Sequence, residues 1–65
     1  MRPKAPKYIM FYLKIDTKGK TQWEIKHANT QFEMEMTNEI MEQSGWKLHS
    51  GFQYDFEYKG YKEML

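Results

Sequence analysis

The sequence has no cysteine among its 65 residues, which excludes a disulfide framework and a cysteine-based zinc site. Its two histidines, His27 and His49, are too far apart in the chain to form a metal site together. No apolar run approaches the roughly 20 residues of a membrane-spanning helix. Lys14 and Asp16 interrupt the first apolar run too early for a signal peptide. We therefore expect a cytoplasmic protein with no membrane segment, no metal and no cofactor.

Recognisable catalytic motifs are also lacking. The sequence contains neither a P-loop nor a Gly-x-Gly-x-x-Gly fingerprint. Ser50 follows His49 directly, and neighbouring side chains on an extended segment diverge, so the pair predicts no nucleophile with its base. Asp55 and Glu57 would place two carboxylates about 7 Å apart on one strand. So short a chain has little material to close a cleft over them, and we expect no catalytic residue and no enzyme activity.

The small size of the chain predicts a marginal core. A domain of this length buries only about 60% of the surface that its unfolded chain exposes. Small folds commonly add disulfides, a metal or oligomerisation. Aromatic residues, 17% of the chain, offer another source of buried area because each large ring buries about 150–250 Å². We therefore expect self-association in addition to an aromatic core.

Two segments alternate with the period of a β-strand. Between Phe52 and Lys59 four aromatic residues alternate with four polar ones, which predicts a strand with one buried face. Residues 8–15 also alternate, and one of their two rows is purely apolar. That row is Ile9, Phe11, Leu13 and Ile15, and the other row is Tyr8, Met10, Tyr12 and Lys14. We expect the purely apolar row to face the core and the tyrosine row to face solvent.

The positions of two glycines predict two hairpins. A three-residue loop at 17–19 pairs Leu13 with Trp23 and places Gly19 at the left-handed third position. A second three-residue loop at 49–51 pairs residues 46–48 with the strand that starts at Phe52, and it places Gly51 at the equivalent position. A two-residue loop would set apolar residues opposite polar ones in both cases.

The middle of the chain is open to two interpretations. Residues 31–36 alternate like a strand, but Thr30 and Glu33 have the spacing of a helix capping box. We favour a helix over 31–44, and the alternative is a strand at 31–36 followed by a short helix from Thr37. In the helix, Phe32, Met36 and Ile40 form a stripe that covers the sheet. Two methionines, at positions 34 and 41, would then point away from it.

These elements predict an α+β fold: a small β-β-α-β-β domain whose antiparallel sheet comes from two hairpins, with one helix packed on one face. The domain would span residues 8–59, between a flexible basic arm at 1–7 and a short tail at 60–65. Gly45-Trp46-Lys47-Leu48 resembles a Gly-Trp-Glu-Leu segment that follows the helix in certain small bacterial domains. The resemblance spans residues 40–48, with Lys47 in place of glutamate, and implies no function.

Charge is unevenly distributed, although the net charge is only +1. Residues 1–28 carry seven basic and two acidic side chains, whereas residues 29–44 carry four acidic and no basic ones. Such polarity can steer partners but does not decide the fold.

Side chains that the predicted core does not use indicate a contact surface. Tyrosine is enriched at interfaces, and methionine adapts to irregular partner surfaces. The predicted partner-binding residues are Tyr8, Met10, Tyr12, Lys14, Lys26, Met34 and Met41. We expect a non-catalytic protein-binding module that uses its open sheet face or a strand edge. Its partners would be another protein and a second copy of itself, and it would serve as a phage or mobile-element inhibitor of a host protein.

An alternative function is binding of single-stranded nucleic acid. Aromatic side chains on a sheet stack bases, and nearby lysines hold phosphates. Tyr8 and Tyr12 would stack, and Lys14, Lys26 and the basic arm would contact phosphates. The small net charge favours the protein-binding interpretation.

Overall fold

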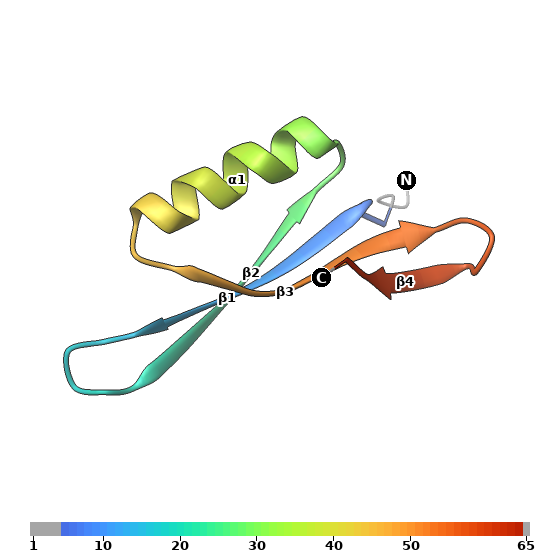
Figure 1. Cartoon of the computed structure of the whole chain (residues 1–65). Coiled ribbons are helices and arrows are strands. Elements are labelled where there is room, and N and C mark those ends of the chain that lie inside the picture. The colour runs from blue at the N-terminus through green and yellow to red at the C-terminus, as the bar shows by residue number, and fades with distance from the viewer. Residues whose placement is uncertain (1–4, 65) are drawn as a thin grey trace.

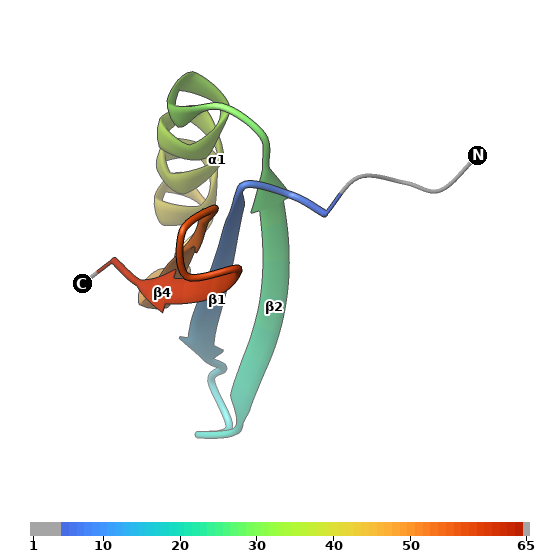
Figure 2. The same cartoon turned by 90° about the vertical axis from the view of Figure 1, so that its right-hand side faces the viewer.

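The computed structural model describes residues 5–64, which form one four-stranded antiparallel sheet and one helix (Figure 1). The elements are β1 (Tyr8–Ile15), β2 (Thr21–Ala28), α1 (Gln31–Gln43), β3 (Lys47–Asp55) and β4 (Gly60–Glu63). The strand order is β2-β1-β3-β4, so β1 and β3 are central and β2 and β4 form the edges. The helix lies on one side of the strands and no helix covers the other (Figure 2). The predicted α+β class and the element order β-β-α-β-β are confirmed.

The first hairpin has the predicted register. Leu13 lies opposite Trp23, and the β1–β2 ladder that contains this pair is uninterrupted. Gly19 adopts φ +81°, the left-handed conformation that the three-residue loop requires. Asp16 closes the loop: its carboxylate accepts from the backbone N–H groups of Lys18 and Lys20 at 2.8 and 2.9 Å. The sequence signal and the turn geometry therefore agree.

The N-terminus of α1 is capped as predicted. The Thr30 hydroxyl accepts from the N–H of Glu33 at 3.1 Å, and the Glu33 carboxylate accepts from the N–H of Asn29 at 3.2 Å. These bonds satisfy donors that a helix start leaves without intrahelical partners. The predicted helix is confirmed at 31–43, and the alternative strand at 31–36 is wrong.

The C-terminus of α1 ends at a Schellman motif. Gly45 adopts φ +87°, and its N–H donates to the carbonyl of Glu42 at 3.0 Å. The N–H of Trp46 donates to the carbonyl of Met41, also at 3.0 Å. Trp46 packs against the core directly after this turn. The Gly45-Trp46 pair therefore ends the helix and directs the chain into β3.

The second hairpin does not have its turn at 49–51, and this prediction was wrong. Residues 49–51 lie inside β3, where Ser50 pairs with Phe11 and Leu48 pairs with Tyr12, so that His49 is an extra residue in a bulge. Gly51 has no positive φ. A Cβ there would lie 3.0 Å from the terminal methyl of Met64, so glycine serves close packing.

The actual turn lies at residues 56–59, inside the segment predicted to be a continuous strand. The Asp55 carboxylate accepts from the N–H groups of Glu57 and Tyr58 at 2.9 and 3.0 Å, and Lys59 adopts φ +59°. β4 follows within the segment predicted to be a tail, so that prediction was wrong for residues 60–63. A local Asp-centred turn thus outweighs the alternation of aromatic residues.

The part of the arm that the structure describes is docked on the sheet. The N–H of Tyr54 donates to the carbonyl of Lys7 at 2.8 Å, and the Tyr61 hydroxyl donates to the carbonyl of Pro6 at 2.6 Å. The basic residues predicted for this arm at positions 2 and 4 lie outside the described residues, as does Leu65.

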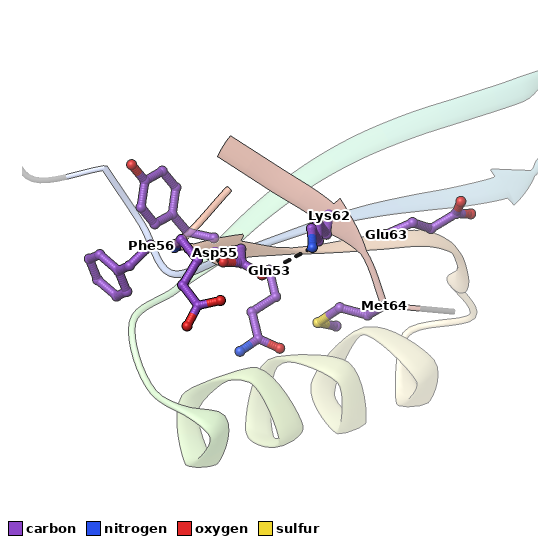
Figure 3. Close-up of a pocket in the computed structure, with 8 residues that line it drawn as sticks. Gln53, Asp55, Phe56, Lys62, Glu63 and Met64 are labelled. Atoms are coloured by element: carbon purple, nitrogen blue, oxygen red, sulfur yellow. Dashed lines mark hydrogen bonds and ion pairs between the residues drawn. The ribbon is translucent and has the colours of Figure 1, made fainter. Parts of the chain in front are cut away.

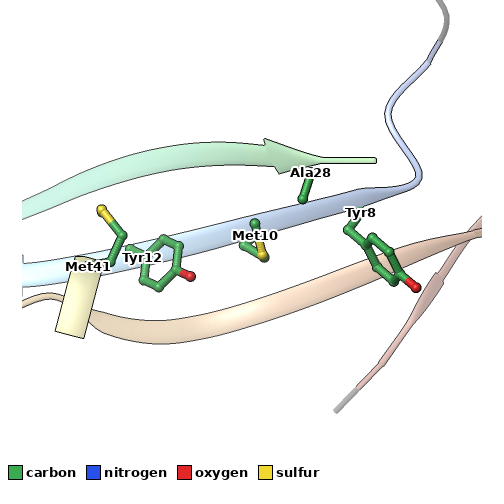
Figure 4. Close-up of a cluster of buried hydrophobic side chains, with 5 residues drawn as sticks. All are labelled: Tyr8, Met10, Tyr12, Ala28 and Met41. Atoms are coloured by element: carbon green, nitrogen blue, oxygen red, sulfur yellow. The ribbon is translucent and has the colours of Figure 1, made fainter. Parts of the chain in front are cut away.

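The helix covers the opposite face of the sheet from the one predicted. Tyr12 and Met10 have exposed fractions of 0% and 1%, and Tyr8 is also buried. Ala28 and Met41 complete the core beneath α1 (Figure 4). The predictions that the tyrosine row is open and that Met41 points away were both wrong, and Met34 also packs against the core.

The helix is rotated accordingly, and its predicted core stripe faces away from the sheet. Phe32, Met36 and Ile40 are exposed side chains on α1. A steric cause lies at the end of β2. Ala28 lies opposite Tyr8 and is too small to obstruct a helix that starts three residues later, whereas the alternate row presents the larger His27 there. The short connection therefore places α1 on the Ala28 side.

Candidate functional site

The side of the sheet that α1 leaves uncovered carries the strongest apolar pattern in the chain. Side chains that alternate with the buried row of β1, together with their cross-strand partners, share this side. We call it the open apolar face, and it consists of Ile9, Phe11, Leu13, Ile15, Trp23, Ile25 and Phe52.

Solvent reaches much of the open apolar face. The exposed fractions of Ile15, Trp23 and Ile25 are 64%, 56% and 50%. Phe11 and Phe52 hold each other in an edge-to-face contact, with ring centroids 5.7 Å apart. Such contacts fix the rings before any partner arrives, because aromatic pairs prefer this geometry. The face is therefore an ordered surface of side chains from β1, β2 and β3.

Charge is nearly absent from the open apolar face. Lys47 lies opposite Leu13 at one end, and Glu63 lies opposite Phe52 at the other. Thr21 contributes a hydroxyl at the end of β2. An apolar centre with a sparse polar rim is the composition of the buried part of a protein–protein interface.

Three of the predicted contact residues cannot reach a partner in this fold. Tyr8, Met10 and Tyr12 are buried under α1, so the surface predicted from them does not exist. The Tyr12 hydroxyl donates to the Asn38 side-chain oxygen at 3.2 Å. Burial raises the pKa of Tyr12, and the Glu42 carboxylate raises it further. The Tyr12 ring is thus a core side chain whose polar end is satisfied.

The predicted lysines lie on the helix side of the sheet. Lys14 donates from Nζ to the Ser44 carbonyl at 3.0 Å and lies 5.7 Å from the centre of the Trp46 ring. It closes the C-terminus of α1, where a cation is favourable. Lys26 is exposed on β2, two residues from Glu24. The structure therefore does not bring the seven predicted contact residues together into one surface.

A hollow of about 680 Å³ lies beside the β3–β4 hairpin (Figure 3). The Asp55 carboxylate is 3.3 Å from the Lys62 ammonium within it, and Gln53 and Met64 extend from the sheet toward α1. The Asp55 carboxylate accepts hydrogen bonds from the backbone N–H of Tyr58 and from the Lys62 side chain, and these bonds lower the pKa of Asp55. A carboxylate held ionised in this way closes a turn and is unsuited to donating a proton.

The bulge in β3 brings one adjacent pair together. Ser50 Oγ lies 2.8 Å from His49 Nδ1, so the expectation that these neighbouring side chains diverge was wrong. Ser50 lies opposite Phe11, and His49 is the extra residue that the bulge adds to β3. The His49 ring also packs edge-to-face on Trp23, with centroids 5.0 Å apart.

Within residues 5–64, no group of three or more His, Cys, Asp or Glu side chains has an arrangement that could hold a metal ion. The same part of the chain contains no helix with the length and apolar character needed to cross a membrane.

Comparisons with known proteins return no relative. No protein-family model matches the chain, and neither curated proteins nor solved structures yield a match. The resemblance of residues 40–48 to small bacterial domains gains no support from these comparisons.

The residues of the open apolar face were all recognisable in the sequence, but they were assigned to the core. Their row in β1 is purely apolar, and Trp23 was correctly paired with Leu13 of this row. The overlooked signal was the small Ala28, which marks the side on which a helix can start close to the sheet.

Proposed function

We propose that the protein is a non-catalytic binding module that presents the open apolar face to an apolar surface on another protein. The observation that carries this proposal is the exposure of Ile15, Trp23 and Ile25 in one nearly uncharged surface. Monomeric proteins rarely expose large contiguous apolar patches, and those that occur commonly mark interaction sites.

Nucleic-acid binding is not the function that the geometry favours. The stacking platform expected for it rested on Tyr8 and Tyr12, and both rings are buried. The open apolar face offers rings but few cations, and phosphate binding depends on basic side chains.

The predicted homodimer is a separate proposal from binding through the face, and two surfaces are available for it: the open apolar face and the free edge of β2. Inhibition of a host protein by a phage or mobile-element product and a cytoplasmic location stay predictions.

Capture from the native host with two matched double variants tests the proposal. Leu13→Ser with Ile15→Ser alters the open apolar face, and Phe32→Ser with Ile40→Ser removes comparable apolar groups from the outer side of α1. We expect proteins that bind the wild type and the helix variant to be lost with the face variant. For a purified partner the loss is at least about tenfold in affinity. Equal capture by all three proteins contradicts the proposal.

A further inference from the structure

Within the described residues 5–64, the edge of β2 is long, regular and unpaired on its outer side. In this part of the chain β2 pairs only with β1, and its eight residues contain neither proline nor glycine. The ladder to β1 has no bulge, and residues 21–27 are exposed. Natural sheets usually shorten, kink or cover such an edge because its free backbone groups recruit other strands. The opposite edge, β4, has only four residues.

The alternation of backbone hydrogen bonds identifies the free groups on β2. The N–H of Asp16 donates to the carbonyl of Lys20 at 2.9 Å, and hydrogen-bonded pairs alternate along an antiparallel ladder. Thr21, Trp23, Ile25 and His27 therefore direct their N–H and C=O groups outward, away from β1. These four residues form the hydrogen-bonding edge that another strand would meet.

Charge selects one register for pairing with a second copy. When two identical antiparallel strands are related by a two-fold axis at one residue, a residue a given number of positions before that residue lies opposite the residue the same number of positions after it in the other copy. An axis at Ile25 places Glu24 of each copy opposite Lys26 of the other. An axis at Glu24 or at Lys26 sets identical charges opposite each other, and an axis at Trp23 sets Lys20 opposite Lys26. An axis at Gln22 sets Lys20 opposite Glu24 but overlaps only three residues of β2. Among the registers that overlap five or more residues of β2, only the one centred on Ile25 pairs opposite charges without a like-charge pair.

The apolar side of β2 is self-complementary in the same register. Ile25 of one copy meets Ile25 of the other, and Trp23 meets His27 in two equivalent places. Trp23, Ile25 and His27 of each copy then form three hydrogen-bonded pairs with the other copy. These pairs add about six backbone hydrogen bonds. Backbone pairing, apolar contact and charge therefore agree on one arrangement.

We propose that a second copy of this chain pairs with β2 edge to edge, in the antiparallel register centred on Ile25. The dimer has one continuous sheet of eight strands, twice the four of each copy. Because the axis is perpendicular to the sheet, both helices lie on one side and both open apolar faces join on the other. The proposal concerns the edge of the sheet, so it stands or falls separately from the binding function of the face.

A lysine in an edge strand normally prevents pairing, and Lys26 alone would do so here. Glu24, two residues earlier, supplies the opposite charge at the matching position of the second copy. The two residues thus disfavour the neighbouring registers and permit this one.

Sedimentation of charge variants tests the proposal. We expect the wild type to be a dimer, and we expect Glu24→Lys and Lys26→Glu each to raise the dimer dissociation constant at least about tenfold, because both cross-strand pairs become repulsive. An equimolar mixture of the two variants should dimerise like the wild type, because opposite charges then meet at both positions. Recovery in the mixture also shows that both variants are folded.

Two controls separate the edge from other surfaces. Glu57→Lys makes the same charge change in the β3–β4 turn, and Phe52→Ser alters the open apolar face on β3, which does not pair with β2. Both should leave dimerisation unchanged. A wild type that stays monomeric, a Glu24→Lys variant that dimerises fully, or a mixture no better than its components would each overturn the proposal.

Discussion

The two sides of β1 differ in both composition and environment. The covered side has Tyr8, Met10 and Tyr12, all of them buried, and the Tyr12 hydroxyl donates to the side-chain oxygen of Asn38 on α1. The uncovered side has an uninterrupted aliphatic and aromatic row that ends in the highly exposed Ile15. The buried side of β1 is thus the less purely apolar of the two, and its exposure would lose less hydrophobic stabilisation.

This difference shows that apolar purity does not decide which side of a small sheet a helix covers. Short connections restrict where α1 can lie, and the side chains beneath it must leave room for its backbone. Ala28 leaves that room, and Met41 and Met34 fill the irregular space over the tyrosines because methionine is flexible. The better apolar row is then left for an outside partner.

The largest predicted effect compares one residue from each side. Tyr12→Ser should lower the free energy of unfolding by about 3–5 kcal/mol, because it removes a fully buried ring. Ile15→Ser, on the open apolar face, should change it by no more than about 0.5 kcal/mol. Urea unfolding at one low protein concentration measures both, since association would otherwise add to the stability.

The reverse ranking of these two variants would break the comparison. It would mean that the aliphatic row is the true core in solution. Met10→Ala provides a second covered-side probe without a hydroxyl, and it should lose about 2–5 kcal/mol.

A smaller effect concerns the helix that creates the difference between the sides. Thr30→Ala should cost about 1 kcal/mol, because the N–H of Glu33 loses its capping acceptor. Thr17→Ala, in the exposed loop of the first hairpin, makes the same chemical change at a different threonine, and its loss of unfolding free energy should be far smaller. Thermal unfolding of both variants provides the measurement, and equal losses would contradict the capping role.

The sequence predicted features that depend on local chemistry. The turn at 17–19, the Thr30–Glu33 cap and the end of the helix within one residue of position 44 are each determined by a few neighbouring residues. The register of β1 on β2 followed from the turn together with the match of apolar residues across the two strands.

Features that depend on distant residues were predicted less well. Gly51 lies in a strand and pairs with Met10, which is 41 residues earlier in the chain, and no local pattern contains that information. The side covered by α1 depends on the fit between Ala28, the helix and the core methionines. The candidate surface was misplaced for that reason, although every residue that forms it had been identified as apolar.

The smallest predicted effect is the contribution of Asp55 to the pH dependence of stability. Backbone N–H donors and Lys62 hold its pKa below the usual value, so the folded state binds this proton less readily than the unfolded state does. The resulting stability is present above the unfolded pKa and is lost as the pH falls through the folded pKa. Asp55→Asn keeps an acceptor for the turn but removes the titration, so its stability should change less than that of the wild type in this acidic range. Unfolding curves at a series of pH values below neutral test this, and identical profiles for the two proteins would show that the turn does not depend on the charge.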